Sequence, residues 1–140
     1  MLTLARLARL LERACASLTL AQYRLLAMIA GGAERASELA GQLALTKPTV
    51  SATIDTLVER GLIARETAAD DRRARRLQLT ASGRDALGAA DASMRVVLDD
   101  LIGRIDDPEV VHRSLGALRD AIDQRRDERR AARTAGPANT

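Results

Sequence analysis

The side chains best suited to chemistry in this sequence are cations and hydroxyls that bind phosphate. Arginines cluster within a five-residue stretch, at positions 72, 73, 75 and 76. A second group, Lys47, Thr49 and Ser51, lies earlier in the chain. Guanidinium groups present N–H donors that match phosphate oxygens, and lysine adds a point charge. These residue types therefore predict recognition of a phosphate-rich partner.

No comparable set of residues predicts catalysis. The sequence has no glycine-rich phosphate loop, no paired catalytic carboxylates and no nucleophile–base set. His112 is the only histidine, with no cysteine or second histidine spaced for zinc. We therefore expect a protein that is not an enzyme, with no cofactor and no metal.

Composition limits the class of protein further. At 140 residues the chain is long enough for one hydrophobic core, and Tyr23 is the only aromatic residue, so the core must be aliphatic. A single cysteine predicts a reducing, cytoplasmic compartment, and the lack of a long apolar run predicts no contact with a membrane. The net charge of +3 equals the excess of arginine in the tail, so local clustering of cations is the better guide to a nucleic-acid partner.

The second group, Lys47, Thr49 and Ser51, lies at the start of a predicted helix over about 46–60. Thr46 is a natural N-cap, Pro48 fits the first turn and Gly61 provides the stop. The spacing of Val50 and the apolar residues after it predicts one buried face. The opposite face carries mostly small residues, among them Ala52, which allows close entry into a major groove.

The arginines belong to a predicted flap of two strands, at about 62–66 and 75–79, joined by a turn at 68–71. Two helices are predicted before the groove-entering helix, at about 20–30 with Thr19 as cap and at about 35–43. The predicted inward residues are Tyr23, Leu26, Ala27 and Ala30 in the first, and Ala36, Leu39, Ala40 and Leu43 in the second. A helix followed by a basic flap suits a DNA duplex.

Three further helices, at about 2–15, 81–104 and 108–126, carry long apolar rows. They are expected to pair two copies of the chain, which would present two recognition helices about 34–36 Å apart. The predicted interface residues are Leu4, Leu7, Leu11, Val111, Leu115, Leu118 and Ile122. Residues 127–140 are charged and then small, and are predicted to be disordered.

Four segments of the sequence resemble the multiple antibiotic resistance regulator (MarR) family of winged helix-turn-helix proteins. They are LTLAQYRLL at 18–26, ELAGQL at 38–43, TKPTVSATIDTLVERGLIAR at 46–65 and DDRRARRLQLTASGR at 70–84. The resemblance implies a mainly α fold with a small β-wing, in one domain over 1–126 with its winged helix-turn-helix at about 19–80. Dimerisation helices would complete the domain.

The resemblance also implies a homodimeric repressor that binds double-stranded DNA at a pseudo-palindromic operator. A small-molecule effector, commonly an aromatic acid, would release it. The implied recognition-helix contacts are Thr46, Lys47, Pro48, Thr49, Ser51 and Ala52. The implied wing contacts are Asp71, Arg72, Arg73 and Arg75, with Arg73 in the minor groove and Asp71 orienting it. Several relatives have arginine where this chain has Ala52. In this chain the contacts with DNA are therefore expected mainly from Lys47, Thr49, Ser51 and the wing.

Two alternatives remain open from the sequence. Cys15 could be a redox-sensing thiol, although a buried thiol acting as a small apolar residue is favoured. The chain could also be a helical protein–protein adaptor that keeps the winged shape without reading DNA, since its body is nearly neutral.

Overall fold

The structure is a computed structural model that describes residues 1–15, 17–33, 35–43, 45–68 and 71–134. The side chains of 67, 68, 71–75, 126, 129, 130, 133 and 134 lie outside this description. The chain divides into two compact units, Met1–Leu98 and Asp99–Thr140. Among the described residues, no helix has the length and apolar character needed to cross a membrane.

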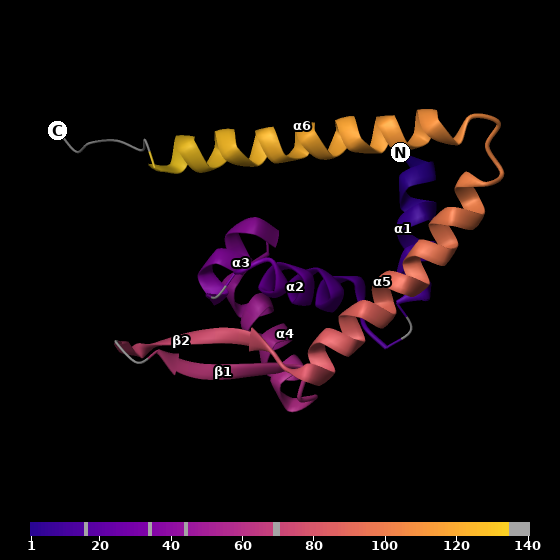
Figure 1. Ribbon diagram of the computed structural model, residues 1–140. Helices are drawn as coiled ribbons and strands as arrows, with labels where there is room; N and C mark the ends of the chain where they lie inside the picture. The colour runs from indigo at the N-terminus through magenta and orange to yellow at the C-terminus, as the bar shows by residue number, and fades with distance from the viewer. Residues whose placement is uncertain (16, 34, 44, 69–70, 135–140) are drawn as a thin grey trace. The chain divides into compact units, whose positions relative to one another are not determined.

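The first unit contains four helices, a hairpin and most of a fifth helix (Figure 1). The helices are α1 (Leu2–Ala14), α2 (Leu20–Ala30), α3 (Ala36–Leu43) and α4 (Lys47–Glu59). The strands β1 (Ile63–Ala68) and β2 (Asp71–Leu79) follow, and then α5 (Ala81–Ile102). This order confirms the predicted mainly α fold with a small β-wing.

Local sequence signals fix the ends of α2. The Thr19 side chain accepts a hydrogen bond from the Gln22 amide, and the Gln22 side chain accepts one from the Thr19 amide, which completes a capping box. At the other end, Gly32 has a φ of 97° and the Ala33 amide donates to the Met28 carbonyl. A left-handed residue is needed there, so glycine is favoured.

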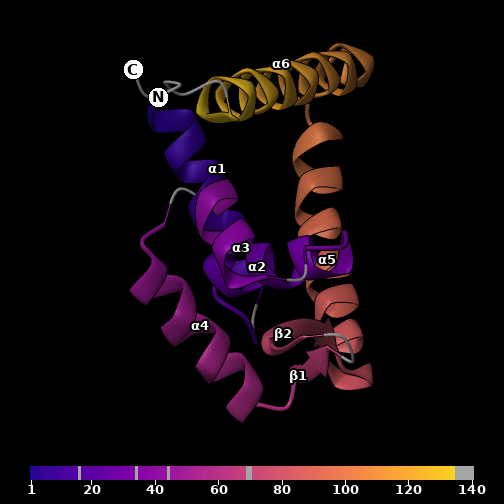
Figure 2. The ribbon, with the colours of Figure 1, turned by 90° about the vertical axis from the view of Figure 1, so that its left-hand side faces the viewer.

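The two strands pair antiparallel, from Ile63 opposite Leu79 at the base to Thr67 opposite Arg75. The next pair is Ala68 with Asp71, so the register shifts between the two pairs. Figure 2 shows the hairpin beside the end of α4. Only two residues, 69 and 70, lie between the strands.

A close packing contact joins the end of α4, the base of the hairpin and the start of α5. The Thr80 hydroxyl donates to the Gly61 carbonyl at 2.7 Å and accepts from the Gly83 amide at 3.0 Å. A Cβ placed on Gly83 would lie 2.0 Å from the Leu62 carbonyl oxygen. Gly83 is therefore required by this contact, and Thr80 is confirmed as the cap of α5.

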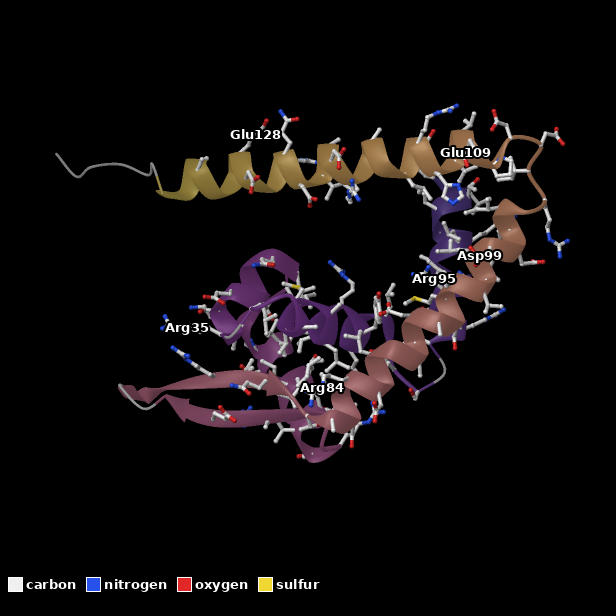
Figure 3. The ribbon with its side chains drawn as sticks, viewed as in Figure 1. Arg35, Arg84, Arg95, Asp99, Glu109 and Glu128 are labelled. Carbon is white, nitrogen blue, oxygen red and sulfur yellow. The ribbon has the colours of Figure 1, made fainter. Side chains whose placement is uncertain are left out.

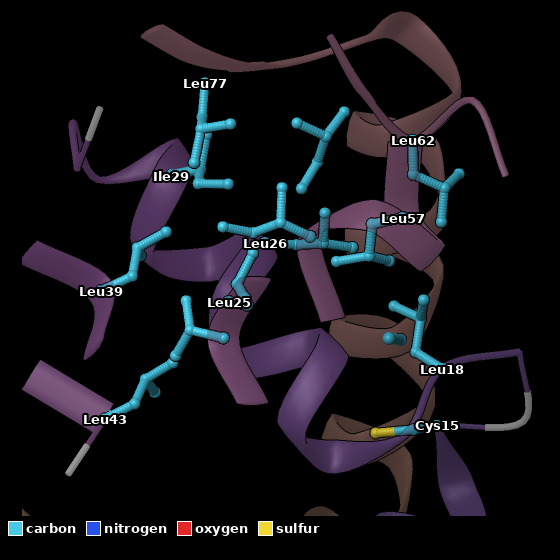
Figure 4. Packing of buried hydrophobic residues seen from close by; sticks show 14 of the residues in the cluster. Cys15, Leu18, Leu25, Leu26, Ile29, Leu39, Leu43, Leu57, Leu62 and Leu77 are labelled. Atoms are coloured by element: carbon cyan, nitrogen blue, oxygen red, sulfur yellow. The ribbon is translucent and has the colours of Figure 1, made fainter. Parts of the chain in front are cut away.

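The core of the first unit is aliphatic, as composition predicts (Figure 4). Its least exposed members come from α2, α3, α4 and β1, and they include Leu26, Leu39, Leu57 and Ile63. Cys15 lies at the edge of the same cluster with 2% of its surface exposed. The predicted buried state of Cys15 is therefore confirmed.

Some predicted details are wrong. In α2 the buried residues are Leu25, Leu26 and Ile29, while the predicted inward Ala30 is exposed. In α3, Ala36 is exposed, while Leu39, Ala40 and Leu43 are buried as predicted. These errors share a cause, because alanine at a helix end contributes little apolar area and its position is set by packing.

The strand boundaries also differ from prediction. Strand β1 runs to Ala68 instead of about 66, and β2 begins at Asp71 instead of about 75. The predicted turn at 68–71 is thus shorter, and its residues 69 and 70 lie outside the described part. The only signal for this strand was the alternation of apolar and polar residues, and it begins at Leu77. The charged residues of β2 that precede Leu77 therefore could not be detected.

The second unit contains the end of α5 and the helix α6 (Pro108–Thr134). The Asp107 side chain accepts a hydrogen bond from the Val110 amide, which caps α6. The helix continues eight residues beyond its predicted end at 126, so the disorder predicted for 127–134 is wrong. Residues 135–140 of the predicted tail lie outside the described residues. Most residues of 127–134 are alanine, arginine or glutamate, which favour a helix, so α6 continues through them.

Candidate nucleic-acid interface

The start of α4 exposes the predicted recognition residues together. Thr46 is its N-cap, and its hydroxyl oxygen lies 3.4 Å from the Thr49 amide that it accepts from. Pro48 occupies the first turn, where a missing N–H costs nothing. All six predicted contact residues are exposed: Thr46, Lys47, Pro48, Thr49, Ser51 and Ala52.

The hydroxyl groups of α4 are not equally available to a ligand. Thr46 and Thr49 bond each other through their hydroxyls at 2.8 Å, while Thr53 and Thr56 donate to carbonyls one turn earlier. The Ser51 hydroxyl has no hydrogen-bond partner in the part of the chain that the structure describes. Ser51 is thus the hydroxyl most ready to bond a base or a phosphate.

The predicted wing residues lie in the irregular part of the hairpin. Between the pairs Thr67–Arg75 and Ala68–Asp71, β2 has three residues and β1 has none. Arg72 and Arg73 are two of those three. The side chains of the predicted set lie outside the described part, so their contacts stay predictions: Asp71, Arg72, Arg73 and Arg75.

An ion pair joins the exposed face of α4 to the base of the wing. The Nη2 of Arg65 on β1 donates to the Oδ1 of Asp55 on α4. The Asp55 side chain is still 55% exposed and that of Arg65 is 32% exposed. The pair therefore lies at the surface, where α4 and the hairpin meet.

A second arginine holds the other end of α4. Arg60 donates to the Gln22 side chain at 3.1 Å and to the Ser17 carbonyl at 2.7 Å. These bonds fix the last turn of α4 against the start of α2. The two helices border a shallow groove that is lined by Thr19, Gln22, Thr49, Ala52, Thr53 and Thr56.

Sequence reasoning did not identify either arginine as a partner for α4. Arg60 and Arg65 belong to the ERGLIAR segment, but spacing along the chain gives no sign of contacts 38 and 10 residues away. It also passed over Arg35, an exposed cation before α3 (Figure 3). The position of Arg35 just before α3, the first helix of the helix-turn-helix pair, was the sequence signal that could have identified it.

Cys15 and Tyr23 lie where α1, α2 and α5 meet. The Tyr23 hydroxyl donates to the Asp91 carboxylate at 2.7 Å. Burial, followed by this bond, raises the pKa of Tyr23 to about 12. Burial, together with Glu12 and Asp91, also raises the pKa of Cys15, which lowers its thiolate fraction at neutral pH.

The predicted dimer residues differ in how far their own chain covers them. On α1, Leu4 is 57% exposed, whereas Leu11 packs against the core. On α6, Val111 is half-buried, but Leu115, Leu118 and Ile122 are 45%, 51% and 47% exposed. Leu7 is half-buried on α1.

Comparison with known proteins bears on both the helices and the wing. Residues 16–74 match the model of the MarR family, a range that includes α2, α3, α4 and β1. MosR of M. tuberculosis, a transcriptional regulator solved in complex with DNA, is 28% identical, with a TM-score of 0.62 over 87% of this chain and 91% of that one.

Two more distant structures share the fold. A mutant of S. aureus MepR bound to an oligodeoxyribonucleotide is 19% identical, with a TM-score of 0.65 over 88% of this chain and 93% of that one. CouR of Rhodococcus jostii, bound to p-coumaroyl-CoA, is 22% identical, with a TM-score of 0.68 over 84% of each chain. Residues 16–74 thus match the MarR family model, and the chain shares the winged helix-turn-helix fold of transcriptional regulators such as MosR.

Proposed function

We propose that this chain is a homodimeric repressor that binds a pseudo-palindromic operator in double-stranded DNA. The observation that carries the proposal is the exposed start of α4, where Lys47, Thr49 and Ser51 are all exposed, together with a wing later in the chain that holds a run of arginines. Lysine and hydroxyl groups on such a helix suit phosphates and base edges in a major groove. MosR, which has the same fold, was solved with DNA.

The wing supplies the second contact in this proposal. Arg73 belongs to the three-residue excess of β2 and would lie in the minor groove, with Asp71 as its orienting partner. Replacing Arg73 with Ala should weaken operator binding about 10-fold or more and reduce its salt dependence by about one counterion. Fluorescence anisotropy at several salt concentrations measures both effects.

The matched control is Arg113→Ala on α6, which removes the same charge from a different element. It should leave operator affinity nearly unchanged. Equal affinity for the Arg73 variant and the unmodified protein, with the fold intact by circular dichroism, would remove the wing from the binding surface.

The competing function is that of a helical protein–protein adaptor. A gel shift with DNA from upstream of the chain's own gene separates the two functions. A regulator should bind that DNA saturably and release it poorly to random sequence, whereas an adaptor should show no preference.

Release by a small molecule is the regulatory part of the proposal. The CouR structure was solved with p-coumaroyl-CoA. We propose an aromatic acid as the class of effector, acting by favouring a half-site spacing that does not match the operator. Thermal stabilisation by such acids, together with loss of operator binding, tests this part.

A further inference from the structure

We infer that Asp55, oriented by Arg65, determines specificity by accepting a hydrogen bond from the exocyclic amine of one base in each half-site. This inference rests on the proposed function and adds to it a residue outside the predicted contact set. Asp55 is an exposed carboxylate on the helix proposed to enter the groove. Such a charge opposes binding to phosphates, so its presence needs an explanation.

The ion pair with Arg65 removes most of that electrostatic cost. Arg65 comes from β1, and its Nη2 donates to Oδ1 of Asp55. The pair is close to neutral as a unit, so it repels the phosphates far less than a lone carboxylate. It also restricts the Asp55 side chain to one direction, as a group that reads a base requires.

One oxygen of Asp55 remains available. In the described part of the chain, Oδ2 of Asp55 has no hydrogen-bond partner. An ionised carboxylate only accepts hydrogen bonds. In the major groove, cytosine N4 and adenine N6 are donors, whereas guanine N7 and O6 and thymine O4 are acceptors. Oδ2 should therefore favour cytosine or adenine and disfavour guanine or thymine.

The surroundings of Asp55 leave room for a base edge. Ala52, three residues earlier, has only a methyl group, and Ser51, four residues earlier, has a hydroxyl with no hydrogen-bond partner among the described residues. Positions three and four apart are neighbours on a helix surface. Asp55 and Ser51 together would form a pair of polar groups, with Ala52 allowing close approach.

The test is selection from a duplex DNA library with a randomised centre, followed by affinity measurements on each single-base change. The unmodified chain should disfavour guanine and thymine by about 5- to 150-fold at one symmetric position. Asp55→Ala should remove that discrimination and leave the other positions unchanged. Asp55→Asn, which keeps the size, should accept guanine or thymine there because it gains a donor.

Variants of Arg65 test its positioning role. Arg65→Lys keeps a cation next to Asp55 and should retain the base preference, whereas Arg65→Gln should lose most of it. Glu59→Ala is the matched control, because it removes an exposed carboxylate from the same helix one turn later. It should raise affinity for all sequences alike.

The outcomes separate the inference from the proposed function. Selection of no sequence by the unmodified chain would overturn the proposed function itself. Selection of a palindrome with an identical base profile in both Asp55 variants would overturn only the inference, and would leave the ion pair as a structural tie.

Discussion

Helices α4 and α6 place similar apolar residues in opposite environments. On α4, Val50, Ile54 and Leu57 are at most 1% exposed. On α6, Leu118 and Ile122 are about half exposed, and no described residue of that helix is buried. One helix thus stabilises its own chain, and the other leaves apolar area uncovered. Apolar area of this kind marks a surface that a partner covers.

The largest effect should come from truncating the buried helix. Ile54→Ala should lower the free energy of unfolding by about 2–5 kcal/mol, because it leaves a cavity where Ile54 is 1% exposed. The loss should be independent of protein concentration. Urea denaturation followed by circular dichroism measures it.

The matched control is the same substitution on α6, Ile122→Ala. At concentrations where the chain is monomeric it should change stability by roughly 0.5 kcal/mol or less. Equal losses for Ile54→Ala and Ile122→Ala would contradict the distinction between the two helices.

A charged substitution on α6 should weaken dimerisation. Leu118→Asp places a carboxylate in the exposed row and should raise the dimer dissociation constant about 30-fold or more, because the charge would be desolvated on assembly. Sedimentation measurements test it. Arg113→Asp introduces the same group on the opposite side of the helix, at 100° per residue, and should have little effect. A dimer unaffected by Leu118→Asp would move the interface away from α6.

The smallest effect on stability should come from the hydrogen bond between Tyr23 on α2 and Asp91 on α5. Tyr23 is charged when deprotonated, and its pKa is raised from 10.0 to about 12. Its contribution to stability is therefore complete below about pH 10 and is lost as the pH rises from about 10 to about 12. Tyr23→Phe should remove this pH dependence at every protein concentration.

Tyr23 is the only tyrosine, so tyrosinate absorbance reports its pKa directly. A midpoint near 10 would show that the bond to Asp91 does not hold in solution.

The sequence predicted the parts of the fold that depend on local signals. Thr19, Thr46 and Thr80 cap their helices as expected, and Gly61, with a φ of 69°, ends α4. These signals work because each satisfies backbone groups within four residues. The exposed start of α4 followed directly from its cap and its apolar spacing.

The parts that were missed depend on contacts between distant residues. The bonds of Arg60 and Arg65 form only when α2, α4 and β1 assemble, and nothing in the residues next to them encodes a partner. The charged half of β2 gave no apolar alternation. The end of α6 was missed because a polar helix has no apolar period.

The contact at Gly83 couples the orientation of α5 to the backbone just after α4. Because Gly83 has no side chain, the first turn of α5 presses directly on the Leu62 carbonyl, just after α4 ends. At 1.5 Å per residue, the 22-residue α5 is about 33 Å long, so a rotation of about 10° at the contact moves its far end by about 6 Å. By the same ratio, a displacement of about 6 Å at the far end of α5 corresponds to a rotation of about 10° at its first turn, next to Leu62.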